Sequence, residues 1–122
     1  MRPPVVLVVD DDARNRKLVR DVLAADGFDT LEAACGEDAI SIACDHRPDL
    51  VLMDIRLPDL DGGEVRQRLK AKPATARIPV VALTALAGAR EVLLEAGFDG
   101  YLEKPIDVRE LPQQVRRLLS PG

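Results

Sequence analysis

Aromatic side chains are scarce in this chain, which has no tryptophan, one tyrosine and two phenylalanines among its 122 residues. Because 47% of the residues are nonetheless hydrophobic, the core must be built from valine, leucine, isoleucine and alanine. That share, together with 31% charged residues, is typical of a folded domain and not of a disordered segment. The length fits one domain, expected to span residues 1–122.

Three further features are missing, and each excludes a class of function. The net charge is −4, so the sequence gives no sign of the basic surface that binds nucleic acid. No hydrophobic run is long enough for a signal peptide or a membrane span, and we therefore expect a cytoplasmic protein with no membrane partner. Cys35 and Cys44 form no metal-ligand pattern, so two reduced thiols are expected in place of a disulfide or a metal site.

Short apolar runs alternate along the chain with stretches in which apolar residues recur at helical spacing. The expected strands cover residues 5–9, 29–33, 50–53, 80–83 and 101–102. The expected helices cover residues 13–26, 36–46, 62–72 and 89–96, followed by a last helix that Asp107 opens and Glu110 helps to cap. Strand and helix alternate throughout, which predicts a parallel sheet covered by helices on both faces.

Polar residues stand where the expected strands end. They are Asp10, Asp11 and Asp12 after the first strand, Asp54 after the third, Thr84 after the fourth and Lys104 after the fifth. Ligands of open parallel sheets bind outside the carboxyl ends of the strands, so these side chains are expected to converge on one edge. Carboxylates held close together repel one another, and a divalent cation relieves that repulsion. The oxygen ligands favour Mg²⁺, which commonly joins one or two carboxylates to a phosphate.

The residues at this edge could bind a phosphoryl group and react with it. A carboxylate such as Asp54 can attack phosphorus and form an acyl phosphate, while the cation neutralises the incoming charge. Thr84 can donate a hydrogen bond to a phosphoryl oxygen, and Lys104 can pair with another as a point charge. The pattern therefore indicates phosphoryl transfer onto an aspartate.

Five segments together resemble the response-regulator receiver family of two-component signalling, and the resemblance covers nearly the whole chain. The segments are Val8–Asp11, Met53–Pro58, Asp61–Gly62, Thr84–Ala85 and Gly100–Ile106. The stretch Asp11–Arg16 is especially similar to single-domain receivers and to receivers attached to hybrid kinases. The resemblance implies a flavodoxin-like α/β fold with parallel strands in the order 2-1-3-4-5. It also implies a signalling switch that catalyses its own phosphorylation and dephosphorylation, not a metabolic enzyme.

The resemblance assigns Asp54 as the phosphoacceptor and as a ligand of Mg²⁺, for which Mn²⁺ could substitute. It implies that Asp11 is a direct metal ligand and that Asp10 acts indirectly, through water or a hydrogen bond. The backbone carbonyl of Arg56 would complete the protein ligands.

The resemblance also assigns roles to residues at the ends of the fourth and fifth strands. The resemblance implies that Thr84 and Lys104 contact the phosphoryl group, and that a cis peptide before Pro105 aims Lys104 into the site. Tyr101 would swing inward when Thr84 moves towards phosphate. A tyrosine that only packs against the core is the alternative for this position.

One segment departs from the family pattern. Thr84 and Lys104 stand closer in sequence than is usual in the family, and the shortage falls in the loop at residues 86–89. That loop belongs to the switch, so its length bears on how the switch works. Arg56 and Leu86 match the positions that in the family tune the lifetime of the phosphorylated state, so the resemblance implies that they screen the phosphoryl group from water.

The resemblance also implies partners. A sensor histidine kinase or a phosphotransfer protein would supply the phosphoryl group, and a downstream protein would bind the surface of the fourth helix, fifth strand and fifth helix. The apolar residues Leu86 and 92–94 exceed what one buried helix face needs, so the same surface could hold a weak homodimer of an otherwise monomeric protein. The basic stretch 14–17 is either a solvated face or a docking face for the phosphodonor. A stand-alone receiver and a receiver from a longer chain both fit the sequence.

Two other functions compete with this one. A phosphatase of the haloacid dehalogenase type shares the fold, the Mg²⁺ and an Asp-x-Asp motif, which Asp10 and Asp12 could supply. Arg14 and the missing acid pair at the fourth strand disfavour it, and turnover of a generic phosphate ester would reveal it. A receiver that serves only as a scaffold is the third hypothesis, favoured by the short loop alone.

Overall fold

The computed structural model describes residues 2–86 and 88–119. Within these residues, five strands form one parallel sheet in the order β2-β1-β3-β4-β5. The strands are β1 (Val5–Val9), β2 (Asp29–Ala33), β3 (Leu50–Asp54), β4 (Val80–Thr84) and β5 (Gly100–Glu103). The helices are α1 (Ala13–Ala25), α2 (Gly36–His46), α3 (Gly62–Lys70), α4 (Arg90–Glu95) and α5 (Leu111–Leu119). This is the flavodoxin-like fold, and the predicted strand order is confirmed.

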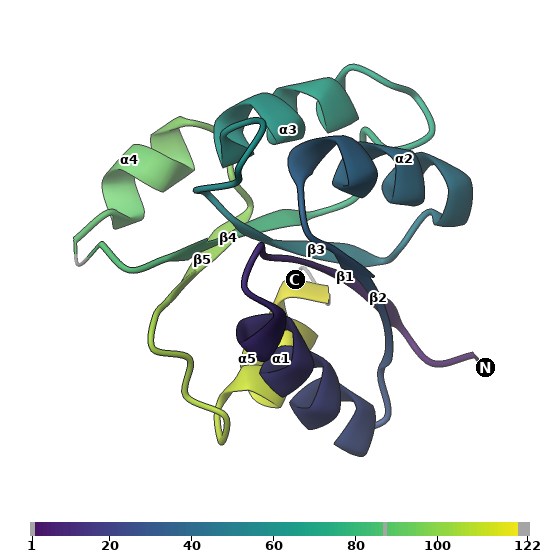
Figure 1. Ribbon diagram of the computed structural model, residues 1–122, viewed down its shortest axis with the longest axis vertical. Coiled ribbons are helices and arrows are strands. Elements are labelled where there is room, and N and C mark those ends of the chain that lie inside the picture. Colours follow the sequence, from purple (N-terminus) through teal and green to yellow (C-terminus); the bar gives the residue numbers. More distant parts are fainter. Residues whose placement is uncertain (1, 87, 120–122) are drawn as a thin grey trace.

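The helices form two layers, one on each face of the sheet (Figure 1). Helices α1 and α5 cover one face, and α2, α3 and α4 cover the other. On β1, Leu7 and Val9 belong to the core cluster under α2, α3 and α4, whereas Val6 and Val8 belong to the cluster under α1 and α5. All four side chains are fully buried, which explains why this strand is a continuous apolar run.

The first helix begins at the predicted residue and ends at Ala25, one residue before the predicted end. The side chain of Asp12 accepts a hydrogen bond from the N–H of Arg14 at 2.9 Å and so caps the start of α1. Gly27 follows the end of the helix with a φ of 90°, a left-handed conformation that glycine adopts without strain. The acidic turn between β1 and α1 is therefore held between two well-defined elements.

The last helix begins later than the sequence predicted, because α5 spans Leu111–Leu119. The carboxylate of Asp107 accepts the N–H of Arg109 at 3.0 Å, and its carbonyl accepts the N–H of Glu110 at 3.1 Å, which makes this segment a turn. Pro112 explains the difference: it has no N–H to donate to the carbonyl four residues earlier, so it must stand in the first turn of a helix. Among the described residues Glu110 makes no side-chain bond back to Asp107, so the capping role predicted for Glu110 was wrong.

Some expectations fall on residues outside the described part of the chain. The predicted domain span includes Met1 and residues 120–122, and the short loop at residues 86–89 includes Ala87. In the described residues, no helix combines the length and the apolarity needed to span a membrane. Cys35 and Cys44 are both free thiols, as predicted.

Candidate functional site

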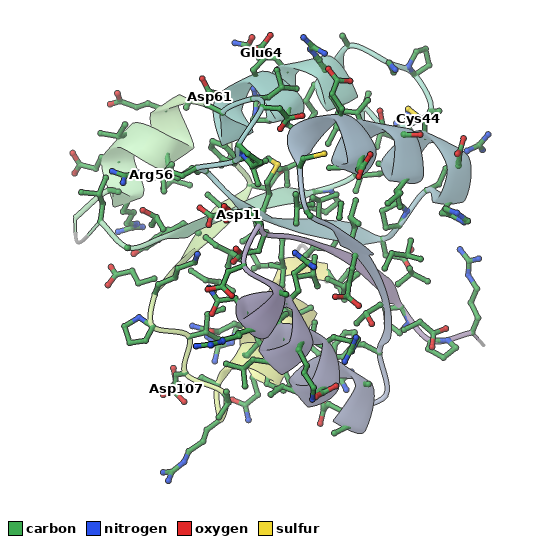
Figure 2. All side chains as sticks on the ribbon, in the orientation of Figure 1. Asp11, Cys44, Arg56, Asp61, Glu64 and Asp107 are labelled. Carbon is green, nitrogen blue, oxygen red and sulfur yellow. The ribbon has the colours of Figure 1, made fainter. Side chains whose placement is uncertain are left out.

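Three carboxylates meet at the carboxyl end of the sheet. Asp10 and Asp11 follow β1, and Asp54 is the last residue of the neighbouring strand β3. One oxygen from each lies within 4.8 Å of the others. In Figure 2, Asp11 lies between the two helix layers. The parallel register brings these ends together, as the sequence predicted.

Asp10 is the most deeply buried acid of the three, with 1% of its surface exposed. Its Oδ1 accepts the N–H of Asp12 at 2.9 Å, which turns the chain into α1. Its Oδ2 lies 3.2 Å from Nζ of Lys104 and 3.4 Å from Nδ2 of Asn15. Its backbone carbonyl accepts a hydrogen bond of 2.7 Å from Nη1 of Arg16. A buried carboxylate needs such partners, and Asp10 has one for each oxygen.

Asp54 is paired directly with Lys104. Nζ of Lys104 lies 2.8 Å from Oδ2 of Asp54, and Oδ1 accepts the N–H of Arg56 at 2.9 Å. Burial by itself would lower the pKa of Lys104, but the hydrogen bond to Asp54 and the attraction of Asp10 outweigh it and raise that pKa above its ordinary value of 10.5. The lysine is therefore an ammonium ion held between two carboxylates.

Backbone pairing between β4 and β5 brings Thr84 and Lys104 together. The N–H of Lys104 donates to the carbonyl of Thr84 at 2.7 Å, which continues the ladder beyond the pair Thr84 and Glu103. The hydroxyl of Thr84 accepts the N–H of Leu86 at 3.0 Å. The peptide bond between Lys104 and Pro105 is cis.

A cavity of about 370 Å³ opens beside these groups. Its lining residues are Asp11, Asp54, Ile55, Arg56, Thr84, Ala85, Leu86 and Lys104. The lining thus contains every predicted contact of the phosphoryl group. Tyr101 is not among the lining residues; it is half-buried and packs against the core cluster under α2, α3 and α4.

Asp59 caps the start of α2, a role that the sequence analysis did not predict. It lies on the loop between β3 and α3, and its carboxylate accepts the N–H groups of Gly36 at 2.7 Å and Glu37 at 2.9 Å. The bonds from Glu37 and Gly36 lower the pKa of this carboxyl below its usual value. Cys35, at the N-cap of α2, makes no side-chain cap bond. A helix that begins without serine, threonine, asparagine or aspartate at its own N-cap was the available signal that a cap comes from elsewhere.

The sequence analysis also did not predict that the side chain of Arg16 points inward to Asp10. The basic stretch 14–17 was expected to be a solvated or a docking face, but the side chain of Arg16 is only 19% exposed and ends on Asp10. Helix geometry explains this, because a residue one turn into α1 directs its side chain back towards the helix start. The remaining residues of the stretch are exposed or half-exposed.

The stretch from residue 6 to residue 116 matches the family model of the response regulator receiver domain. The chain belongs to this family. The receiver is 40% identical over 120 residues to the polar-differentiation response regulator DivK of Brucella anthropi, an alignment that covers 97% of this chain and 98% of DivK. The match supports a receiver of two-component signalling and not a phosphatase of the haloacid dehalogenase type.

Solved structures place the receiver in the same family. The chemotaxis response regulator CheY4 of Vibrio cholerae superposes with a TM-score of 0.89 at 25% identity, covering 95% of this chain and 98% of that one. The receiver domain of a sensor histidine kinase from Pseudomonas aeruginosa superposes with a TM-score of 0.86 at 35% identity, covering 96% and 98% of the two chains. That structure has a magnesium ion coordinated in its active site cleft.

Proposed function

We propose that this receiver accepts a phosphoryl group on Asp54, in a Mg²⁺-dependent reaction, from a phosphohistidine of a sensor kinase or phosphotransfer protein. The observation that carries the proposal is that Asp11, Asp54 and the ammonium of Lys104 line one cavity, with the buried Asp10 3.2 Å from the same ammonium. A carboxylate that only stabilised the fold would not need two further acids beside it, since like charges at this distance repel.

The donor set fits a hard divalent cation. Asp11 and Asp54 offer carboxylate oxygens, Arg56 offers its backbone carbonyl, and Asp10 would act through water or a hydrogen bond. When bound there, Mg²⁺, or Mn²⁺ in its place, supplies positive charge that neutralises the incoming phosphoryl oxygens.

The proposed reaction is a single displacement at phosphorus. A carboxylate oxygen of Asp54 forms a bond to phosphorus as the bond from phosphorus to the donor imidazole nitrogen breaks, and the imidazole leaves with the electron pair. Lys104, already 2.8 Å from Asp54, would pair with a phosphoryl oxygen, and the Thr84 hydroxyl would donate to another. Water attack on the acyl phosphate later restores Asp54.

The switch is the second part of the proposal. When the Thr84 hydroxyl leaves the N–H of Leu86 for the phosphoryl group, the space behind it is filled by Tyr101, one strand away. This would change the surface formed by α4, β5 and α5, which binds a downstream protein. Val92 is 69% exposed on this surface, so a weak homodimer through it fits an otherwise monomeric protein. The whole chain, residues 1–122, would be one cytoplasmic receiver that binds neither nucleic acid nor membrane.

Acetyl phosphate with and without Mg²⁺, followed by intact mass measurement, tests the function. The wild-type protein should gain about 80 Da, the mass of HPO₃, only when Mg²⁺ is present. If the protein gains nothing from acetyl phosphate or from a phosphorylated histidine phosphotransfer protein, the proposal is wrong and a scaffold role stands in its place.

Arg56 and Leu86 are proposed to set the lifetime of the phosphorylated state. Both line the cavity beside Asp54, and Leu86 is 55% exposed, so both can limit the access of water to a phosphoryl group there. Arg56→Asn and Leu86→Ala should each shorten the half-life of the phosphorylated protein, because water reaches the phosphorus more easily. The decay of the added mass after removal of acetyl phosphate gives the half-life. Arg77→Asn, at an exposed arginine outside this cavity, is the matched control and should leave it unchanged.

A further inference from the structure

We propose that Arg16 is a positioning residue that fixes the peptide between Asp10 and Asp11 and thereby sets the affinity of the site for Mg²⁺. The proposal rests on the proposed function, since it assigns a determinant of the same metal site. Neither the composition nor the predicted helix face pointed to this residue.

Arg16 joins three elements of the fold. From α1, its Nη1 donates to the carbonyl of Asp10 at 2.7 Å, and its Nε lies 3.4 Å from Oε1 of Glu32 on β2. Glu32 is held in turn by Nη1 of Arg20, at 3.0 Å from its Oε2. The guanidinium therefore has anchors on both sides, and its low exposure limits competition from water.

The bonded oxygen belongs to the peptide group that links Asp10 to Asp11. Because a peptide group is planar, a bond to its oxygen restricts the movement of the two Cα atoms in the same plane, from which the side chains of Asp10 and Asp11 leave. Asp11 is exposed, and among the described residues its carboxylate has no hydrogen-bond donor of its own. The direction of its side chain thus depends on the backbone, which Arg16 holds at the carbonyl of Asp10 and the Asp10 carboxylate holds at the N–H of Asp12.

The charge of Arg16 acts in the opposite sense. A cation near the acid cluster weakens the attraction for Mg²⁺, so its removal would by itself strengthen binding. That field is reduced by Glu32, which lies against the same guanidinium. The hydrogen bond to Asp10, in contrast, has no substitute in the described contacts. Positioning is therefore expected to outweigh charge.

Calorimetric titration of the full chain with Mg²⁺ tests the inference with three variants. Arg16→Met should weaken Mg²⁺ binding by about tenfold, the effect usual for residues that orient metal ligands. Arg16→Lys keeps the charge but not the planar fork, so its affinity should fall in the same direction. Arg20→Met is the matched control, because Arg20 contacts Glu32 but not Asp10, and its affinity should stay at the wild-type value.

Three results would overturn the inference. The first two are an Mg²⁺ affinity equal to that of the wild-type protein in Arg16→Met or in Arg16→Lys. The third is a loss of Mg²⁺ affinity in Arg20→Met as large as in Arg16→Met, which would point to the charge network as a whole. Cooperative unfolding in circular dichroism checks that each variant is folded, and if Arg16→Met is not, Arg16→Lys decides. Failure of the wild-type protein itself to bind Mg²⁺ would instead contradict the proposed function.

Discussion

The Asp54→Asn variant should gain no mass from acetyl phosphate and Mg²⁺ under conditions in which the wild-type protein gains about 80 Da. An amide is a far weaker nucleophile than a carboxylate, and it carries no charge to attract the metal. Asp54 is 9% exposed and hydrogen-bonded through both oxygens, and asparagine has nearly the same size, so the fold should be preserved. The loss is expected to be complete because, among the described residues, no other acid both bonds Lys104 and lines the cavity.

Asp12→Asn is the control for this experiment. Asp12 stands at the same edge of the sheet and loses the same charge, but it lies outside the acid group and caps α1. Asparagine caps helices as well as aspartate does, so this variant should be phosphorylated like the wild-type protein. A mass gain in Asp54→Asn equal to that of Asp12→Asn would show that the phosphoacceptor lies elsewhere.

Lys104→Met should slow phosphorylation by about two orders of magnitude, the usual cost of removing a preorganised group that stabilises developing charge. The ammonium lies 2.8 Å from Asp54, the distance at which it can pass to a phosphoryl oxygen with little movement. The time course of the mass gain with acetyl phosphate measures the rate. An unchanged rate would mean that Lys104 serves only the fold.

The same variant should be less stable at neutral pH by about 2 kcal/mol, because Asp10 and Asp54 lose their shared cation. This is below the roughly 3–5 kcal/mol that fully buried pairs cost, since Lys104 and Asp54 keep 20% and 13% of their side-chain surface exposed. Because the folded state raises the pKa of Lys104 above 10.5, its stabilising effect is complete below that pH and is lost as pH rises through the raised value. The difference in stability from the wild-type protein should therefore shrink as pH rises through that value.

Urea unfolding at several pH values, followed by circular dichroism, measures the difference in unfolding free energy between Lys104→Met and the wild-type protein. Lys70→Met is the matched control: Lys70 has a similar exposure of 25%, bonds the carbonyl of Ile78 at 2.8 Å, and lies near Asp99, away from the acid cluster. Its loss should cost stability without slowing phosphorylation. A pH-independent gap for Lys104→Met would contradict the proposed electrostatic origin.

The alternation of strands and helices and the identity of the acids follow from the sequence pattern, whereas the order of the strands in the sheet was implied by the resemblance to receivers. Continuous apolar runs are needed by strands buried on both faces, and a parallel sheet gathers their carboxyl ends at one edge. Asp54 and Lys104 could be brought together from these rules, although 50 positions separate them. The end of α1 was predictable because glycine at residue 27 has few other uses after a helix.

Only the tertiary structure decided how the groups at this edge hold one another. The cap of α2 came from Asp59 on a distant loop, and the side chain of Arg16 turned inward to the carbonyl of Asp10. Each is a contact between side chains and backbone groups that lie apart in the chain, so no local pattern encodes it. The sequence determined which chemistry gathers at the edge of the sheet, because strand ends and residue types are local properties. The positions of these functional groups relative to one another depend on hydrogen bonds that form only when the helices and strands have packed.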